Sequence, residues 1–75
     1  MRTVLIDREP VELYKVLKFE GIAASGAEAK QLIAEGEVTV NSESETRKRR
    51  KMLSGDVISV FGEELELQLD TPSSL

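Results

Sequence analysis

SGAEAKQLIAEGEVTVN, residues 25–41, carries the densest set of structural signals in this chain. Ser25 is followed three residues later by Glu28, which is the spacing of a capping box at a helix N-terminus. Small and apolar residues then recur with the spacing of one helix face, at Ala29, Leu32, Ile33 and Gly36. Gly36 can adopt the left-handed conformation that ends a helix. The pattern therefore predicts a helix that is capped by Ser25 and ends at Gly36.

The residues after this helix predict a strand and a turn. Val38 and Val40 alternate with polar residues, which is the period of a half-buried strand over residues 37–41. Asn tolerates the left-handed conformation, so a turn is expected at Asn41-Ser42 without a glycine, at the start of a polar loop.

The basic run, residues 47–51, has the sequence RKRRK. As an extended strand it would alternate between two faces. One face would carry Arg47, Arg49 and Lys51, and the other would carry Lys48 and Arg50. Arginine offers a planar fork that binds phosphate through two hydrogen bonds, and lysine offers a point charge. The run is therefore a candidate phosphate-binding segment.

The N-terminal part of the chain predicts an edge strand and a first helix. Residues 3–6 are a short β-favouring run that is followed by a turn. A helix is expected to begin near Val11 or Glu12 and to end at Gly21. Its inward face would carry Leu13, Val16 and Leu17. The short link at residues 22–24 implies that the two helices pack against each other.

The C-terminal part predicts two strands joined by a tight hairpin. A turn is expected at residues 54–56, a β-branched strand at 57–61, and a two-residue connection at Gly62-Glu63. Residues 64–69 alternate strictly between polar and apolar side chains, which is the clearest strand signal in the chain. Residues 70–75 are a polar tail that we expect to be disordered.

These elements predict one domain of the α+β class. A chain of 75 residues is the size of a single domain, and we assign residues 1–69 to it. Two packed helices are expected against one face of a small, mostly antiparallel sheet. Phe19 and Phe61 are expected in the core.

The order and spacing of these signals resemble the S4-like RNA-binding domain, which is named after a protein of the small ribosomal subunit. The chain is most similar to the free-standing bacterial branch of this family, the YbcJ/YaaA-like proteins, over residues 11–61. The residues that carry the resemblance are Leu17, Lys18, Ser25, Gly26, Ala29, Lys30, Ile33, Glu35, Gly36, Val38, Val40, Asn41, Thr46, Arg47, Lys48, Arg49, Lys51, Gly55 and Asp56. The resemblance implies an αL motif, in which the outer faces of the two helices and the following basic segment form one RNA-binding surface. Many members have Asn-Gly where this chain has Asn41-Ser42, and other branches carry Arg where it has Gly26.

Charge is distributed unevenly along the chain. The formal net charge is −4, but half of the ten basic residues lie in the basic run, and the remainder of the chain carries −9. The local field governs binding to nucleic acid more than the net charge does. The alternative interpretation of the run is a solvated surface with no ligand.

Two further features are candidate contacts for RNA. Lys15 and Lys18 lie together on the first helix and Lys30 lies one turn into the second, although ordinary surface lysines fit the same pattern. The N–H groups of Ser25 and Gly26 can bind a phosphate, unless the capping box already occupies them. The candidate RNA-binding residues are therefore Lys15, Lys18, Ser25, Gly26, Lys30, Arg47, Lys48, Arg49, Arg50 and Lys51.

Catalysis and metal binding are not expected. The chain has no Cys and no His, which excludes a disulfide framework and the usual zinc ligands. It also has no phosphate-binding loop of the P-loop or Rossmann type, so we expect no catalytic residue, cofactor or metal. With Phe19 and Phe61 in the core, too few aromatic side chains are left to stack the bases of a single strand.

The leading hypothesis is a non-enzymatic, monomeric protein that binds structured RNA, such as ribosomal or transfer RNA, as the resemblance implies. The lack of Cys fits a reducing cytoplasm, and the apolar runs are too short to span a membrane, so neither a membrane nor a small-molecule substrate is expected as a partner. The alternative is a protein-interaction module whose basic strand docks on an acidic partner. The two hypotheses differ on whether the purified protein binds folded RNA.

Overall fold

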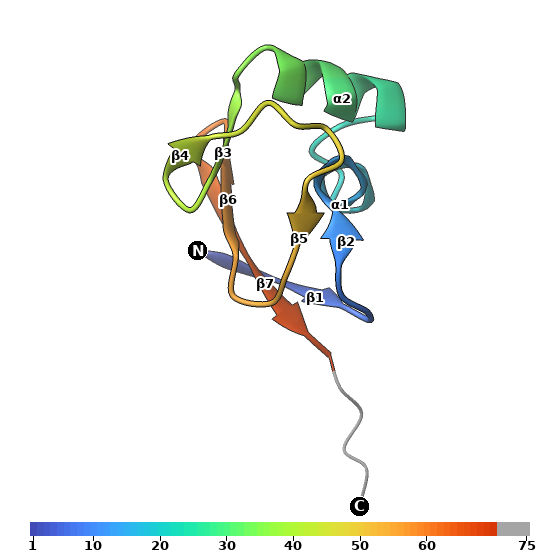
Figure 1. The fold of residues 1–75 in the computed structure, drawn as a ribbon, viewed down its shortest axis with the longest axis vertical. Coiled ribbons are helices and arrows are strands. Elements are labelled where there is room, and N and C mark those ends of the chain that lie inside the picture. The colour runs from blue at the N-terminus through green and yellow to red at the C-terminus, as the bar shows by residue number, and fades with distance from the viewer. Residues whose placement is uncertain (71–75) are drawn as a thin grey trace, which may run out of the picture.

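The structure is a computed structural model that describes residues 1–70, which form two helices and seven strands (Figure 1). The helices are α1 (Leu13–Phe19) and α2 (Gly26–Ala34). The strands are β1 (Arg2–Ile6), β2 (Val11–Glu12), β3 (Val38–Val40), β4 (Glu43–Ser44), β5 (Lys51–Met52), β6 (Val57–Val60) and β7 (Glu63–Leu69). The sequence predicts a disordered tail over residues 70–75. Asp70 instead donates its N–H to Ile6 O at 2.8 Å, and residues 71–75 lie outside the described residues.

Five of the strands form one sheet in the order β1-β7-β6-β3-β4. The pairs β7-β6, β6-β3 and β3-β4 are antiparallel, whereas β1 pairs with β7 in parallel, with Arg2 opposite Leu65. β2 and β5 form a separate antiparallel pair. The predicted α+β class with a mostly antiparallel sheet is confirmed, and residues 3–6 lie on an edge strand as expected.

The core is one hydrophobic cluster to which the helices and the strands both contribute. From α1 it receives Leu13, Val16 and Leu17, and from α2 it receives Ala29 and Ile33. The sheet adds alternate strand residues: Val4, Ile6, Val38, Val40, Ile58, Val60, Leu65 and Leu67. Alternation places these side chains on one side of the sheet, where the helices cover them. Within residues 1–70, neither helix is long and apolar enough to cross a membrane.

Each of three helix boundaries has a local structural cause. The Ser25 Oγ accepts a hydrogen bond from Glu28 N at 3.2 Å, so the predicted cap of α2 is confirmed. Gly36 has φ of 80° and ends α2 as expected. α1 begins at Leu13, slightly later than predicted, because the two preceding residues pair with β5 as strand β2.

Phe19 is exposed, contrary to the prediction that it lies in the core. Its exposed fraction is 69%. It follows the buried residue Leu17 by two positions, which is about 200° around a helix, so its side chain is directed away from the core.

Phe61 was also predicted to lie in the core, but its exposed fraction is 62%. It has φ of 52° and Gly62 has φ of 78°, so these two residues form the tight turn between β6 and β7. The connection predicted at Gly62-Glu63 is therefore displaced by one residue, because Glu63 already pairs with Val60 in the sheet.

Candidate nucleic-acid interface

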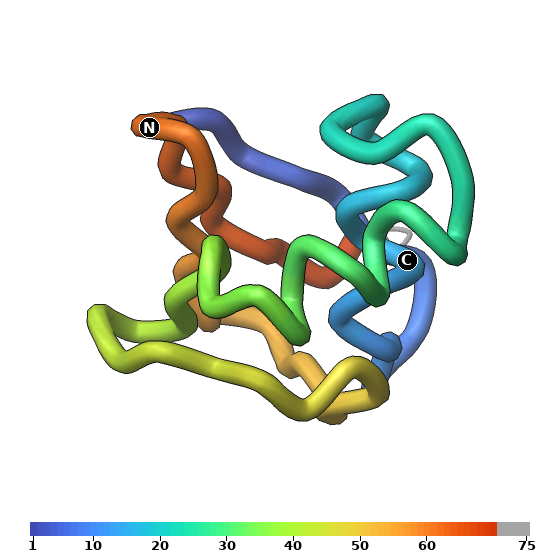
Figure 2. The backbone as a smooth tube through the Cα atoms, turned by 90° about the horizontal axis from the view of Figure 1, so that it is seen from above, coloured from blue at the N-terminus to red at the C-terminus, as the bar shows by residue number. Residues whose placement is uncertain are grey.

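The basic run forms a turn instead of the predicted strand. Residues 48–49 are the turn, which is closed by a hydrogen bond from Arg50 N to Arg47 O at 3.2 Å, and only Lys51 belongs to a strand, β5. The predicted alternation of the five side chains between two faces is therefore wrong. The run crosses from β4 to the start of α1, as the yellow segment of Figure 2 shows.

Backbone carbonyl groups of the basic run cap α1. Leu13 N donates to Arg50 O at 2.9 Å, and Tyr14 N donates to Lys48 O at 3.2 Å. These N–H groups belong to the first turn of the helix, where intrahelical acceptors are missing. The Glu12 side chain at the N-cap position makes no capping hydrogen bond. The run is therefore fixed to the helix that carries two of the candidate lysines.

Glu45 holds two arginines of the basic run. Glu45 is only 6% exposed. Its carboxylate accepts three hydrogen bonds from Arg47, through N, Nε and Nη2 at 2.9–3.0 Å. It also accepts one from Arg50 Nη1 at 2.6 Å. The hydrogen bonds from Arg47 and then Arg50 lower the pKa of Glu45 to about 2. The carboxylate is therefore ionised at neutral pH and offsets part of the charge of both arginines. This internal contact also explains why the run bends, since it draws two of its side chains back toward residue 45.

Tyr14 connects three cations from different parts of the chain. Lys30 Nζ lies 4.6 Å from the centre of its ring, Arg49 Cζ 5.6 Å and Lys15 Nζ 6.0 Å. These distances allow cation–π attraction. Sequence reasoning misses this role of Tyr14, because the capping of α1 is what brings Arg49 to the ring. The one available signal was the position of Tyr14 next to Lys15 on the outer side of the first helix.

Glu12 gathers two of the same cations. Its carboxylate lies 3.2 Å from Lys15 Nζ and 3.4 Å from Arg49 Nη1. The hydrogen bond from Lys15 is the main cause that lowers the pKa of Glu12, and the charge of Arg49 adds to it. Glu12 therefore holds Lys15 and Arg49 together, and both cations stay exposed.

Ser25 and Gly26 occupy structural positions at the start of α2. The Ser25 hydroxyl accepts from Glu28 N, as the sequence predicts for a cap. A Cβ at Gly26 would lie 3.6 Å from Tyr14 Cε2, so the backbone here approaches the ring closely. The start of α2 thus packs beside the same tyrosine that Lys30 contacts.

Four candidate lysines have no carboxylate partner among the described residues: Lys18, Lys30, Lys48 and Lys51. Lys18 is separate from the tyrosine cluster, and its Nζ lies 5.9 Å from the centre of the Phe19 ring. A positive charge that no nearby carboxylate offsets is available to an external anion. The structure therefore gathers Lys15, Lys30 and Arg49 around one ring and places Lys18 one turn further along α1.

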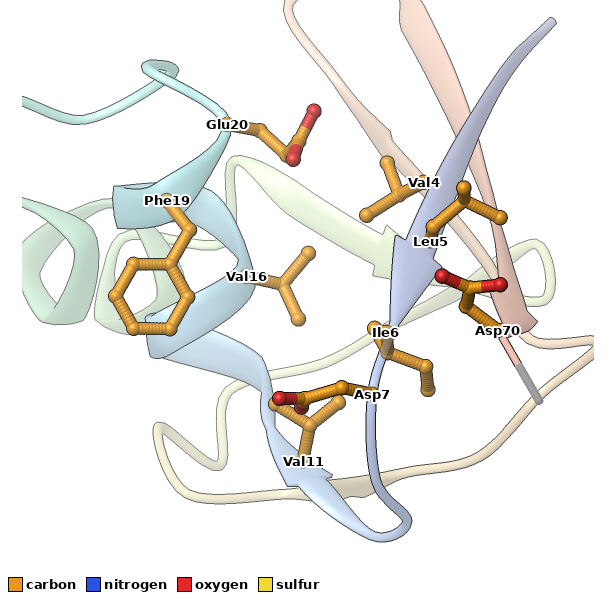
Figure 3. A pocket seen from close by; sticks show the side chains of 9 residues that line it. All are labelled: Val4, Leu5, Ile6, Asp7, Val11, Val16, Phe19, Glu20 and Asp70. Atoms are coloured by element: carbon orange, nitrogen blue, oxygen red, sulfur yellow. The ribbon is translucent and has the colours of Figure 1, made fainter. Parts of the chain in front are cut away.

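A groove lies between β1 and α1 (Figure 3). Its volume is about 370 Å³, and its walls are largely apolar. The carboxylates of Asp7, Glu20 and Asp70 line its rim, and these negative charges oppose a phosphate. Within residues 1–70, no group of three His, Cys, Asp or Glu side chains could hold a metal ion.

The fold and the site define a class of small α+β domains in which two packed helices and a basic turn meet on one side of a sheet. The family model of the S4 domain matches residues 4–68, which is most of the chain. The chain therefore belongs to the S4 domain family.

Individual relatives agree with this assignment. The protein YbcJ of Escherichia coli (strain K12) is 44% identical over 68 residues, which cover 89% of this chain and 97% of that protein. A Bacillus subtilis (strain 168) protein named "Probable ribosome maturation protein RlbA" is 39% identical over 59 residues, which cover 79% of this chain and 83% of that protein. The solution structure of E. coli YbcJ, described as revealing an αL motif involved in RNA binding, matches with a TM-score of 0.69 and 43% identity, covering 91% of this chain and 87% of that one. The predicted S4-like, YbcJ-like family and the αL fold are confirmed.

Proposed function

We propose that this chain is a non-enzymatic protein whose single domain, residues 1–69, binds structured RNA such as ribosomal or transfer RNA. The proposed contacts, which we name the RNA face, are Lys15, Lys18, Ser25, Gly26, Lys30, Arg47, Lys48, Arg49, Arg50 and Lys51. One observation carries the proposal: Lys15, Lys30 and Arg49 meet around the Tyr14 ring. This meeting concentrates positive charge from three segments in a chain whose net charge is negative.

Phosphate neutralisation is the proposed mechanism. Lys48 and Lys51 are exposed and lack a carboxylate partner among the described residues, so they can contact phosphates directly. Arg47 and Arg50 share the buried Glu45 carboxylate, and their main contribution is to hold the turn in shape. A fixed arrangement of cations recognises the backbone geometry of a folded RNA more readily than a flexible strand.

The relatives support an RNA ligand. The YbcJ structure is described as containing an RNA-binding αL motif, and the name of the B. subtilis protein refers to ribosome maturation. Ribosomal RNA is therefore the first RNA to test. We place the protein in the cytoplasm, as a monomer without a small-molecule substrate, because the proposed ligand is found there and the proposed contacts all lie in one chain.

The experiment is a titration of fluorescently labelled, folded ribosomal RNA hairpins with the purified protein. Wild type should bind, and a variant with Lys48→Gln and Lys51→Gln should bind about tenfold or more weakly, since two phosphate contacts are lost. The matched control carries Thr3→Glu and Gln68→Glu, two exposed positions on adjacent strands. It changes the net charge by the same amount, and its affinity should stay closer to wild type.

Two results would contradict the proposal. If wild type binds no folded RNA but retains an acidic protein from the same cells, the chain is a protein-interaction module. If the control variant loses as much affinity as the lysine variant, the attraction depends on net charge alone and the RNA face does not exist.

A further inference from the structure

Phe19 presents an aromatic ring to solvent at the end of α1. Its exposed fraction is 69%, and the ammonium group of Lys18 lies 5.9 Å from the centre of the ring. In Figure 3 the ring lies beside α1, farther from β1 than the buried side chain of Val16. An exposed aromatic ring is the kind of surface that nucleobases stack on.

The ring forms one wall of a hollow of about 460 Å³ next to the RNA face. The hollow is lined by Asp7, Arg8, Pro10, Val11, Glu12, Lys15, Phe19 and Lys51. Its volume lies within the range of about 300–1,000 Å³ that small organic ligands occupy. Lys15 and Lys51 belong to the RNA face, so the hollow is continuous with the proposed phosphate contacts.

The charges around this hollow favour a nucleotide. Arg8, Lys15 and Lys51 contribute three positive charges, and Asp7 and Glu12 contribute two negative charges. Both carboxylates are already engaged, Asp7 with Arg8 at 3.5 Å and Glu12 with Lys15 at 3.2 Å. Lys51 has no carboxylate partner among the described residues and is free to hold a phosphate.

The neighbouring groove of Figure 3 is a poorer site for the same ligand. It shares Asp7, Val11 and Phe19 with the hollow, but its other charged side chains are Glu20 and Asp70, and no cation lines it. A nucleotide whose base reaches Phe19 would therefore approach from the side of Lys15 and Lys51, where its phosphates are attracted.

We propose that this hollow takes one unpaired nucleobase, which stacks on Phe19 while Lys51 holds a flanking phosphate. The inference rests on the proposed function, and it specifies the ligand as structured RNA with a bulged or looped-out nucleotide beside a helical stem. A single exposed aromatic suits one such base, whereas readers of extended single strands use several.

The test compares two RNA hairpins of equal length, one fully paired and one with a single bulged 2-aminopurine. Wild type should bind the bulged hairpin at least about fivefold more tightly, which is the lower end of what one base–aromatic stack contributes. The 2-aminopurine fluorescence should fall on binding, because stacking quenches it. Phe19→Leu should abolish both the preference and the quenching, and should leave the affinity for the paired hairpin unchanged.

Phe61→Leu is the matched control, since Phe61 is similarly exposed in the β6–β7 turn and does not line the hollow. It should behave as wild type, and circular dichroism should show that both variants are folded. If wild type binds both hairpins equally without quenching, or if Phe19→Leu keeps the preference, the stacking site is wrong while RNA binding stands. In that case an exposed Phe19 is better assigned to docking of a protein. If neither hairpin binds, the proposed function itself fails.

Discussion

The Lys30 Nζ atom lies 4.6 Å from the centre of the Tyr14 ring, so a cation on α2 is held against an aromatic side chain on α1. The same ring has Arg49 of the basic run at 5.6 Å. Three segments that are separate in sequence therefore share one organising side chain. Affinity for an anion depends on such prior arrangement, because cations already in place lose less conformational entropy on binding.

The first prediction concerns this ring. Tyr14→Leu should weaken binding of a folded RNA hairpin by about fivefold to thirtyfold, because each exposed cation–π contact contributes roughly 0.5–1 kcal/mol and at least two are lost. Fluorescence titration at fixed salt measures the change. Tyr14→Phe keeps the ring and should bind like wild type. Equal affinities for the Leu variant and wild type would show that the ring does not organise the cations.

The second prediction concerns Glu45. Glu45→Gln removes the charge that holds Arg47 and Arg50, and should lower the free energy of unfolding at pH 7 by about 1–3 kcal/mol. The pKa of Glu45 falls from its ordinary value of 4.5 to about 2 in the folded state. A carboxyl group with a lowered pKa stabilises the fold above pH 4.5, and this contribution is lost as the pH falls toward 2.

Urea unfolding of both proteins at pH 7, 4.5 and 3 measures this contribution. The gap in stability between wild type and Glu45→Gln should be largest at pH 7 and should narrow at each step. Glu43→Gln, which removes an exposed carboxylate two residues earlier, serves as the control and should change little. A gap that stays constant with pH would mean that Glu45 acts through its shape alone.

The third prediction separates the members of the basic run by salt dependence. Each phosphate contact contributes roughly 0.7–0.9 to the slope of log affinity against log salt. Lys48→Gln with Lys51→Gln should flatten the slope by about 1.4–1.8, since both lysines lack a carboxylate partner among the described residues. Arg47→Gln should flatten it by clearly less than the roughly 0.7–0.9 of one phosphate contact, because Glu45 already offsets this charge. A change as large as one full contact would show that the Glu45 contact opens when RNA binds.

The fourth prediction concerns the start of α2. Ser25→Ala removes the acceptor of Glu28 N and should cost about 0.5–2 kcal/mol, which lowers the melting temperature by several degrees in so small a domain. Ser25→Thr retains the hydroxyl and should recover most of the loss. Melting curves followed by circular dichroism measure the effect. If the curve of the Ala variant overlays that of wild type, the Ser25 cap does not stabilise α2.

The parts of the fold that sequence predicts well are those with local causes. The Ser25 cap, the left-handed Gly36 and the turn at Asn41-Ser42 each depend on neighbouring residues, and the structure confirms all three. Alternation of Leu65 and Leu67 with polar residues likewise predicts their burial on one side of the sheet. Local signals of this kind are sufficient because the hydrogen bonds they describe are formed within a few residues.

The errors arise where distant segments decide the outcome. The basic run was predicted to be extended, but carbonyl groups capping α1 and the buried Glu45 carboxylate bend it into a turn. Phe19 and Phe61 were placed in the core by hydrophobicity alone, whereas helix rotation and a positive φ turn them outward. The placement of the candidate site residues therefore required the structure, even though their identities were visible as charges in the sequence.

The parallel pairing of β1 with β7 has a consequence for the order of events during translation. Arg2 faces Leu65, so the first strand finds its partner only after nearly all of the described chain has been synthesised. Pairs so distant along the chain form slowly, because a large loop must close first. The residues of the RNA face, between positions 15 and 51, leave the ribosome before that closure. A nascent chain of this protein therefore exposes its cations before its sheet can be completed, because the last strand has to emerge before β1 can pair with it.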